Sequence, residues 1–263
     1  MKKFLYYLDI YFFNIYIYFK SFSQYKVDFI IGILSVVMQA SIGLIFIKVI
    51  YNNIPVIEGW SYNELLLMFG FSSCGIALFI IFFSEIWMIG PKYVARGELT
   101  ILLTKPLSPL FQIVSQRVKL ENMFQFFLGV GAIIYALVGT NKLEPINLLQ
   151  VLIMVIVSLM VFFSLNLLLA TFSFWTINSN NIVFAVYALR EYGRYPIQMF
   201  PKILQIVLII IFPFAFTAFY PSIAILSSNL FILLVSILAS GLLTICAIKF
   251  WRFGLRHFES AGA

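Results

Sequence analysis

The stretch Gly90–Val118, GPKYVARGELTILLTKPLSPLFQIVSQRV, is a polar interruption between long apolar segments. Its charged residues and prolines are Lys92, Arg96, Glu98, Lys105, Arg117, Pro91, Pro106 and Pro109. The pattern between the prolines predicts a short helical run, Tyr93–Thr104, with an apolar part. A basic, partly amphipathic helix held between two membrane spans is expected to bind something at the membrane surface.

The composition around this stretch is that of a membrane protein. The chain is 63% hydrophobic and 10% charged, with a mean hydropathy of +1.04, whereas soluble domains carry about 25% charged residues. The net charge of +7 comes from basic residues beside the apolar segments, which indicates topology and contact with lipid headgroups rather than nucleic acid. The sequence therefore predicts an all-α integral membrane protein that binds membrane lipids and no nucleic acid.

Segment lengths predict how often the chain crosses the bilayer. A helix needs about 20 apolar residues to cross the hydrocarbon, and six segments qualify within one domain, 1–263. The predicted spans are 27–50, 62–89, 120–138, 148–176, 203–219 and 230–249. Residues 1–26 are rich in Tyr and Phe and predict an N-terminal interfacial helix; a further span is the alternative.

The end of the fifth predicted span is irregular. Pro213 interrupts a short segment, and proline removes a backbone donor and kinks a helix. Residues 220–229 are too apolar for a solvated loop and too short to cross, so they predict a re-entrant segment at the outer face. A kinked span that ends later is the alternative.

Charge placement predicts the orientation. If both termini are cytoplasmic, fifteen of the seventeen Lys and Arg residues, among them Arg190, Arg194 and Lys202, lie inside, and only Lys48 and Lys142 lie outside. This positive-inside bias predicts that the segment 91–118 is cytoplasmic.

The sequence offers no centre for an enzyme. Its single histidine, His257, excludes a catalytic triad and a HExxH zinc site, and no GxxxxGK[ST] loop is present to hold a nucleotide. Cys74 and Cys246 lie in apolar spans, and neither has other metal-ligating residues at the spacing that a metal site needs. We expect no catalytic residue, no metal and no bound cofactor.

Four residues are candidates for a translocation path or gate: Glu85, Asn166, Pro213 and Phe214. Glu85 near the end of the second span either pairs with a basic residue or takes part in the gate, because a charge within a span is costly. Asn166 is expected to form an interhelical hydrogen bond or to contact substrate. No chain of carboxylates crosses the membrane, and no inverted repeat with broken helices is visible, which counts against an ion-coupled carrier or channel as the alternative function.

Two motifs in these places carry a resemblance to a known family. YVARGELTILLTKPLSPLFQI (93–113) resembles the G-E-L, apolar stretch and P-L-x-P pattern of permease subunits of type-2 ABC exporters. REYGRYPIQMFPKIL (190–204) and FPFAFTAFYPS (212–222) resemble elements of the bacterial branch that includes drug, bacteriocin and polysaccharide exporters.

This resemblance implies a permease of the bacterial cytoplasmic membrane. The permease would form half of a pathway with a second copy or, as we favour, a related permease in a heterodimer. ATP and Mg²⁺ would lie on a separate ABC ATPase subunit. The cytoplasmic segment would be the coupling helix that docks on this ATPase, through the residues Val94, Ala95, Arg96, Gly97, Glu98, Leu99, Thr100, Ile101 and Leu102. The cargo is not specified by these motifs.

Overall fold

The computed structural model describes residues 2–22, 26–53, 59–176, 186 and 188–258. Helix is the dominant secondary structure of these residues, and they contain no strand. The chain is an all-α membrane protein, as the composition predicts. Of the segment 177–202, which lies between the fourth and fifth predicted spans and mixes polar with apolar residues, residues 177–185 and 187 lie outside the described part.

Five helices of the described residues are long and apolar enough to cross a membrane. They are Phe29–Val49 within α2 (Lys26–Asn53), Tyr62–Val94, Leu120–Gly139, Pro145–Phe174 and Leu230–Arg256. The second consists of α3 (Tyr62–Phe83), the 3₁₀ helix η1 (Ser84–Met88) and the π-helix η2 (Ile89–Val94). The third joins η3 (Leu120–Asn122) to α6 (Met123–Gly139), the fourth joins α7 (Pro145–Thr171) to η4 (Phe172–Phe174), and the fifth is α11 (Leu230–Arg256).

Local sequence signals set where these helices begin. Ser61 and Glu64 form a capping box at the start of α3, in which each side chain bonds the other's backbone N–H. Pro145 occupies the first turn of α7, where its missing N–H costs nothing. At α11 the side chain of Asn229 accepts a hydrogen bond of 2.9 Å from the N–H of Phe231.

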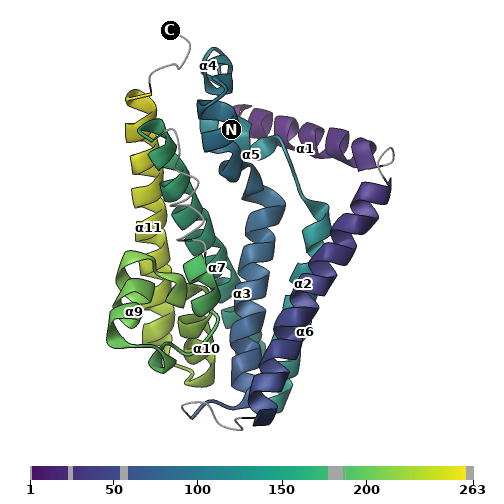
Figure 1. The fold of residues 1–263 in the computed structure, drawn as a ribbon, viewed down its shortest axis with the longest axis vertical. Coiled ribbons are helices and arrows are strands. Elements are labelled where there is room, and N and C mark those ends of the chain that lie inside the picture. Colours follow the sequence, from purple (N-terminus) through teal and green to yellow (C-terminus); the bar gives the residue numbers. More distant parts are fainter. Residues whose placement is uncertain (1, 23–25, 54–58, 177–185, 187, 259–263) are drawn as a thin grey trace.

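Helix α3 is the centre of the bundle, with α6 on one side and α7 on the other (Figure 1). Gly70 and Gly129 permit the close approach of α3 and α6, because a Cβ on Gly129 would lie 3.1 Å from the carbonyl oxygen of Gly70. Small residues at such crossings are typical of membrane helices, whose association depends on packing. Helix α11 covers the other face of α7, where Ser164 and Thr244 are joined by a hydrogen bond of 2.9 Å.

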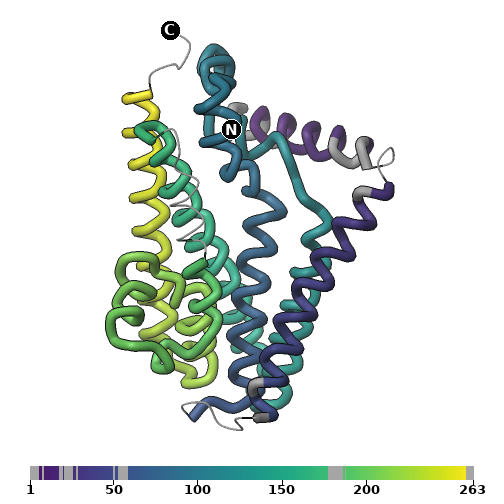
Figure 2. Tube along the Cα trace, viewed as in Figure 1, coloured from purple at the N-terminus to yellow at the C-terminus, as the bar shows by residue number. Residues whose placement is uncertain are grey.

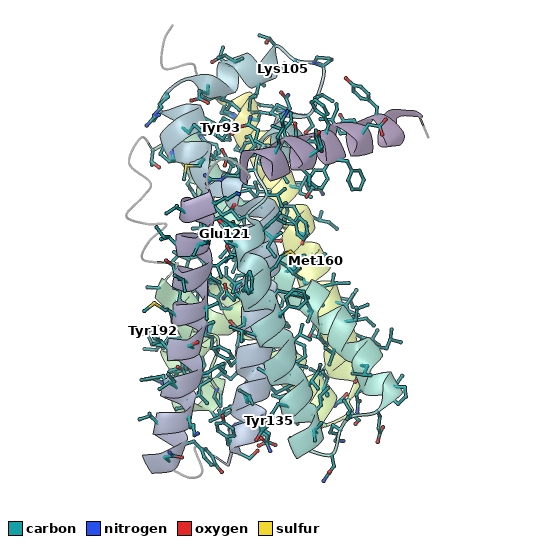
Figure 3. All side chains as sticks on the ribbon, turned by 90° about the vertical axis from the view of Figure 1, so that its right-hand side faces the viewer. Tyr93, Lys105, Glu121, Tyr135, Met160 and Tyr192 are labelled. Atoms are coloured by element: carbon teal, nitrogen blue, oxygen red, sulfur yellow. The ribbon has the colours of Figure 1, made fainter. Side chains whose placement is uncertain are left out.

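The molecule has two distinct ends. Helix α1 (Lys2–Phe22) runs across one end and contacts α5 (Pro109–Ser115); α4 (Glu98–Leu103) and the last turns of α11 lie at the same end, which we call the hairpin end (Figures 1 and 2). At the opposite end, which we call the far end, lie the last turn of α6 and the first turn of α7. Figure 3 shows Lys105 at the hairpin end and Tyr135 at the far end.

The predicted span 203–219 is not one continuous helix. Helix α9 (Lys202–Ile206) and the π-helix η6 (Val207–Ile211) give one apolar helix of ten residues, and a 3₁₀ helix, η7 (Phe214–Thr217), follows Pro213. At 1.5 Å per residue, ten residues reach about 15 Å, or half of the hydrocarbon. Ser158 of α7 donates a hydrogen bond of 2.8 Å to the carbonyl of Thr217 and so satisfies a backbone group at the break.

Helix α10 (Phe219–Leu226) covers most of the predicted re-entrant segment 220–229. It packs against α3, α7 and α11, and Pro221, Ala224 and Ile225 are buried. Helices α9 and α10 both lie in the half of the molecule toward the far end (Figure 1). Residues 202–226, which contain α9 and α10, therefore gather beside the far halves of the long helices.

Three basic residues that the charge count placed with the cytoplasmic set do not lie at the hairpin end. Tyr192 lies in the half toward Tyr135 (Figure 3), and α9, which begins at Lys202, lies in the same half. Arg190 and Arg194, on either side of Tyr192, both pair with Glu191. This pairing lowers the cost of placing arginine in an apolar region, so a count of basic residues alone misplaces them.

Candidate functional site

The hairpin 89–116 comprises η2, α4, the following loop and α5 up to Gln116, and it projects from the end of α3 (Figures 1 and 2). It contains every residue of the predicted docking set. We describe it from its base, where it joins the membrane helix, to its exposed tip.

At the base, Glu85 is held by two polar groups, and a third side chain contacts both of them. Its carboxylate lies 3.0 Å from the ammonium of Lys92 and 3.0 Å from the hydroxyl of Tyr93, and only 7% of its side chain is exposed. Gln116, at the end of α5, brings its amide oxygen 2.6 Å from the same hydroxyl and 3.2 Å from Lys92 Nζ. The hydroxyl has one proton, so it donates to one of the two oxygens at a time. Of the two interpretations that the sequence leaves open for Glu85, the structure contains the ion pair.

The helix changes from α to 3₁₀ and then to π geometry at residues 84–94, which include Glu85, Lys92 and Tyr93. The α-helix ends at Phe83, and the carbonyl of Ile81, freed from the helical ladder, accepts a hydrogen bond of 3.1 Å from the N–H of Lys119. The segment that leads from the hairpin to the third membrane helix is thus hydrogen-bonded to the second membrane helix, close to the point where α-helical geometry ends. Burial, reinforced by Arg117, lowers the pKa of Lys119 from its ordinary value. A change to 3₁₀ and π geometry of this kind often marks a functional hinge.

The predicted helical run Tyr93–Thr104 is divided. Tyr93 and Val94 still belong to the second membrane helix, and α4 begins only at Glu98. Gly97 between them has a φ of +72°, a left-handed conformation that glycine adopts without steric cost. Sequence periodicity cannot show such a turn, since glycine is also compatible with a helix.

The predicted docking residues separate into buried and exposed groups. Leu99 is fully buried and Leu102 is 5% exposed, and both pack in a core cluster with Tyr93, Ile113 and Trp251. The exposed residues are Ala95, Arg96, Thr100 and Ile101; Val94, Gly97 and Glu98 are partly buried. Ile101 is 60% exposed, which is unusual for an isoleucine in a well-packed hairpin. The surface available to a partner is therefore narrower than the predicted set.

Gln112 holds the tip of the hairpin in place. This residue is 7% exposed, and its amide nitrogen donates hydrogen bonds of 2.9 Å to the carbonyls of Leu102 and Leu107. Helix α1 braces α5 from the other side, since Asn14 donates to Ser115 Oγ over 3.3 Å and the rings of Tyr7 and Phe111 lie 4.6 Å apart. A force applied at the tip would thus reach both α1 and the base of the hairpin.

Asn166 joins this region to α7. Its side-chain oxygen accepts a hydrogen bond of 2.7 Å from the indole N–H of Trp87 in η1, and its amide nitrogen donates to the carbonyl of Phe162 over 2.7 Å. Asn166 is 5% exposed. Of the two roles left open by the sequence, the structure contains the interhelical hydrogen bond.

Pro213 and Phe214 lie at the other end of the same series of contacts. Phe214 is 3% exposed, and its ring lies 6.3 Å from that of Phe162, the residue whose carbonyl bonds Asn166. Gly193 packs so closely on Phe214 that an added Cβ would lie 2.8 Å from the Cβ of Phe214. The two motifs 190–204 and 212–222 therefore meet in space, and a series of contacts runs from Trp87 through Asn166 and Phe162 to Phe214, which follows Pro213.

Replacing Asn166 with leucine tests this series. The indole N–H of Trp87 loses its acceptor in an apolar setting, so we expect a loss of about 1–3 kcal/mol in stability. Thermal unfolding of the purified protein in detergent measures the change. The double variant Asn166→Leu/Trp87→Phe removes both partners and should lose less than the sum of the two single variants. Additive losses would show that the hydrogen bond contributes nothing.

Comparison with known proteins identifies one family. A family model described as "ABC-2 family transporter protein" matches residues 36–262, which is most of the chain and includes the whole hairpin. No curated protein and no solved structure matches.

Proposed function

Because the chain belongs to the ABC-2 family of transporter proteins, and is thus a multi-pass membrane permease of the ABC type, we propose that it is the permease subunit of an ATP-driven exporter. The hairpin 89–116 is where a separate ABC ATPase subunit docks. ATP and Mg²⁺ bind to that ATPase, and this chain binds no cofactor of its own.

The observation that carries the proposal is a rigid hairpin with an exposed apolar tip. Ile101, Thr100 and Arg96 are exposed apolar, polar and cationic residues of the hairpin, while the buried Leu99 and Leu102 anchor α4. A groove on a partner gains affinity from burying a side chain such as Ile101, and a braced hairpin loses little entropy on binding. A rigid hairpin can also transmit a movement of the ATPase subunit to the membrane helices.

The path of the force follows the contacts of the site. Closure of the ATPase pair on binding ATP moves the hairpin, and the contacts of Gln116 with Lys92 and Tyr93 carry the motion into the second membrane helix, where both residues contact Glu85. The bond between Trp87 and Asn166 passes it to α7. The pathway then alternates between inward-facing and outward-facing states, whose populations ATP shifts.

Topology and assembly complete the proposal. The hairpin end faces the cytoplasm with both termini, α1 lies along the surface of the bacterial cytoplasmic membrane, and the segment after η6 is re-entrant at the outer face before the last of six spans. One chain supplies half of the pathway, so the working unit pairs it with a second permease. We favour a related permease, in a heterodimer.

Transport by reconstituted vesicles tests the proposal. The permease is purified with its ATPase and placed in vesicles with the hairpin outward, and a panel of fluorescent amphiphiles is offered. We expect at least one to accumulate when ATP is added, with no change when an ionophore collapses the proton gradient. Accumulation that needs the gradient and ignores ATP would contradict the proposal and indicate an ion-coupled carrier.

A further inference from the structure

A groove lies between α2, α3 and α6 in the half of the molecule toward the far end, away from every residue of the proposed docking site. It has a volume of about 410 Å³, within the range of small-molecule sites. It is lined by Leu44, Ile45, Lys48, Tyr62, Leu66, Phe127, Leu128, Gly131, Ala132 and Tyr135.

The polar groups of this groove gather at one end. Lys48 is one residue before the end of the α2 span, Tyr62 begins α3, and Tyr135 lies in the last turns of α6 at the far end of the molecule (Figure 3). The rest of the lining is apolar and extends along α6 to Phe127, two turns or about 12 Å from Tyr135. The groove is therefore amphipathic, with one cationic end and one apolar arm.

The charge of the lining selects the occupant. Lys48 is the one ionised side chain among the lining residues, and it is exposed at the mouth of the groove. An ammonium at the level of the headgroups attracts anionic lipids, and tyrosines are favoured at the same level. An acyl chain matches the apolar arm, because α2 and α6 leave space there: an added Cβ on Gly131 would meet no atom within 4 Å.

We propose that this groove binds one phospholipid with an anionic headgroup, its phosphate at Lys48 and one acyl chain along Phe127 and Gly131. Helix α2 contacts the described chain mainly through α3, α6 and η3. A lipid between α2 and the α3–α6 pair fills the space on the inner side of α2 and holds that helix against the bundle.

Native mass spectrometry of the purified protein tests this, after exchange into mixed phosphatidylglycerol and phosphatidylcholine. The wild-type chain should retain one phosphatidylglycerol with about fivefold preference, the effect of one lysine near the membrane surface. Lys48→Gln should retain both lipids equally. Gly131→Leu adds a side chain to the groove lining at a position where its Cβ meets no atom within 4 Å, and it should lower retention by about tenfold or more.

Gly241→Leu is the matched control, because Gly241 is also inside a long membrane helix, α11, and an added Cβ there also meets no atom within 4 Å. It should retain the lipid as the wild type does. The proposal is overturned if the wild type shows no preference for phosphatidylglycerol, if Lys48→Gln keeps the preference, or if Gly131→Leu retains as much lipid as Gly241→Leu.

Discussion

Replacing Ile101 with aspartate is expected to weaken binding of the ATPase subunit by about a hundredfold while leaving the permease folded. Ile101 is 60% exposed, so the fold loses little. In the complex its burial is worth about 1.5–3 kcal/mol, and an aspartate at the same place must in addition lose its hydration. A loss of about 2.7 kcal/mol is a hundredfold in affinity. Titration of the ATPase against the permease in nanodiscs measures it.

The matched control is Ile146→Asp. Ile146 is 56% exposed, close to the value for Ile101, but it lies in the first turn of α7 at the far end, where an aspartate also favours the helix N-terminus. The same substitution there should leave ATPase binding unchanged. Equal losses from the two variants would mean that the effect is general, and the docking assignment would be wrong.

Replacing Lys92 with methionine is expected to cost about 3 kcal/mol in stability. The variant leaves the carboxylate of Glu85, 7% exposed, without its cation, and removing one partner of a buried pair costs about 3–5 kcal/mol. We place the loss at the lower end because 32% of the Lys92 side chain is exposed. For a chain of this size such a loss lowers the Tm by roughly 6–12 °C, measured by thermal unfolding in detergent.

Two further variants separate the ion pair from other effects. Glu85→Gln/Lys92→Met removes both charges and should recover most of the loss, since a neutral replacement of a buried pair is often tolerated. Lys105→Met, an exposed lysine in the loop of the hairpin, should change stability by less than about 0.5 kcal/mol. If the double variant is as unstable as Lys92→Met, the carboxylate of Glu85 is not the cause.

Hydropathy predicted most of the membrane helices, because whether a segment can cross a bilayer depends on the length and composition of that segment. Residues 62–89 and 230–249 fall within helices that continue to Val94 and Arg256, where polar residues extend them beyond the apolar part. The segment 203–219 differs for a local reason. Its apolar length suggests a span, but the chain turns at Phe212 and Pro213, and whether it resumes depends on contacts such as that of Ser158 with Thr217.

The sequence predicted where the docking segment lies, but it did not predict which of its residues are buried and which are exposed. Apolar spacing groups Leu99, Ile101 and Leu102 together, and only the burial of Leu99 and Leu102 in the structure shows that these two face inward. The partners of Glu85, Lys92 and Tyr93, both lie in η2, but Gln116, which contacts both of them, follows α5, so the complete cluster depends on the hairpin closing. The pairing of Arg190 and Arg194 with Glu191 had a signal in the spacing REYGR, which the charge count passed over.

The most direct test of the central claim is photocrosslinking from the hairpin tip. A photoreactive amino acid is placed at Ile101 in the assembled complex, and in a second sample at Tyr192, which is 44% exposed in the opposite half. We predict a crosslink to the ATPase subunit from position 101 and none from position 192. A crosslink to the ATPase from Tyr192, or labelling of lipid alone from Ile101, would contradict the assignment of the hairpin as the docking site.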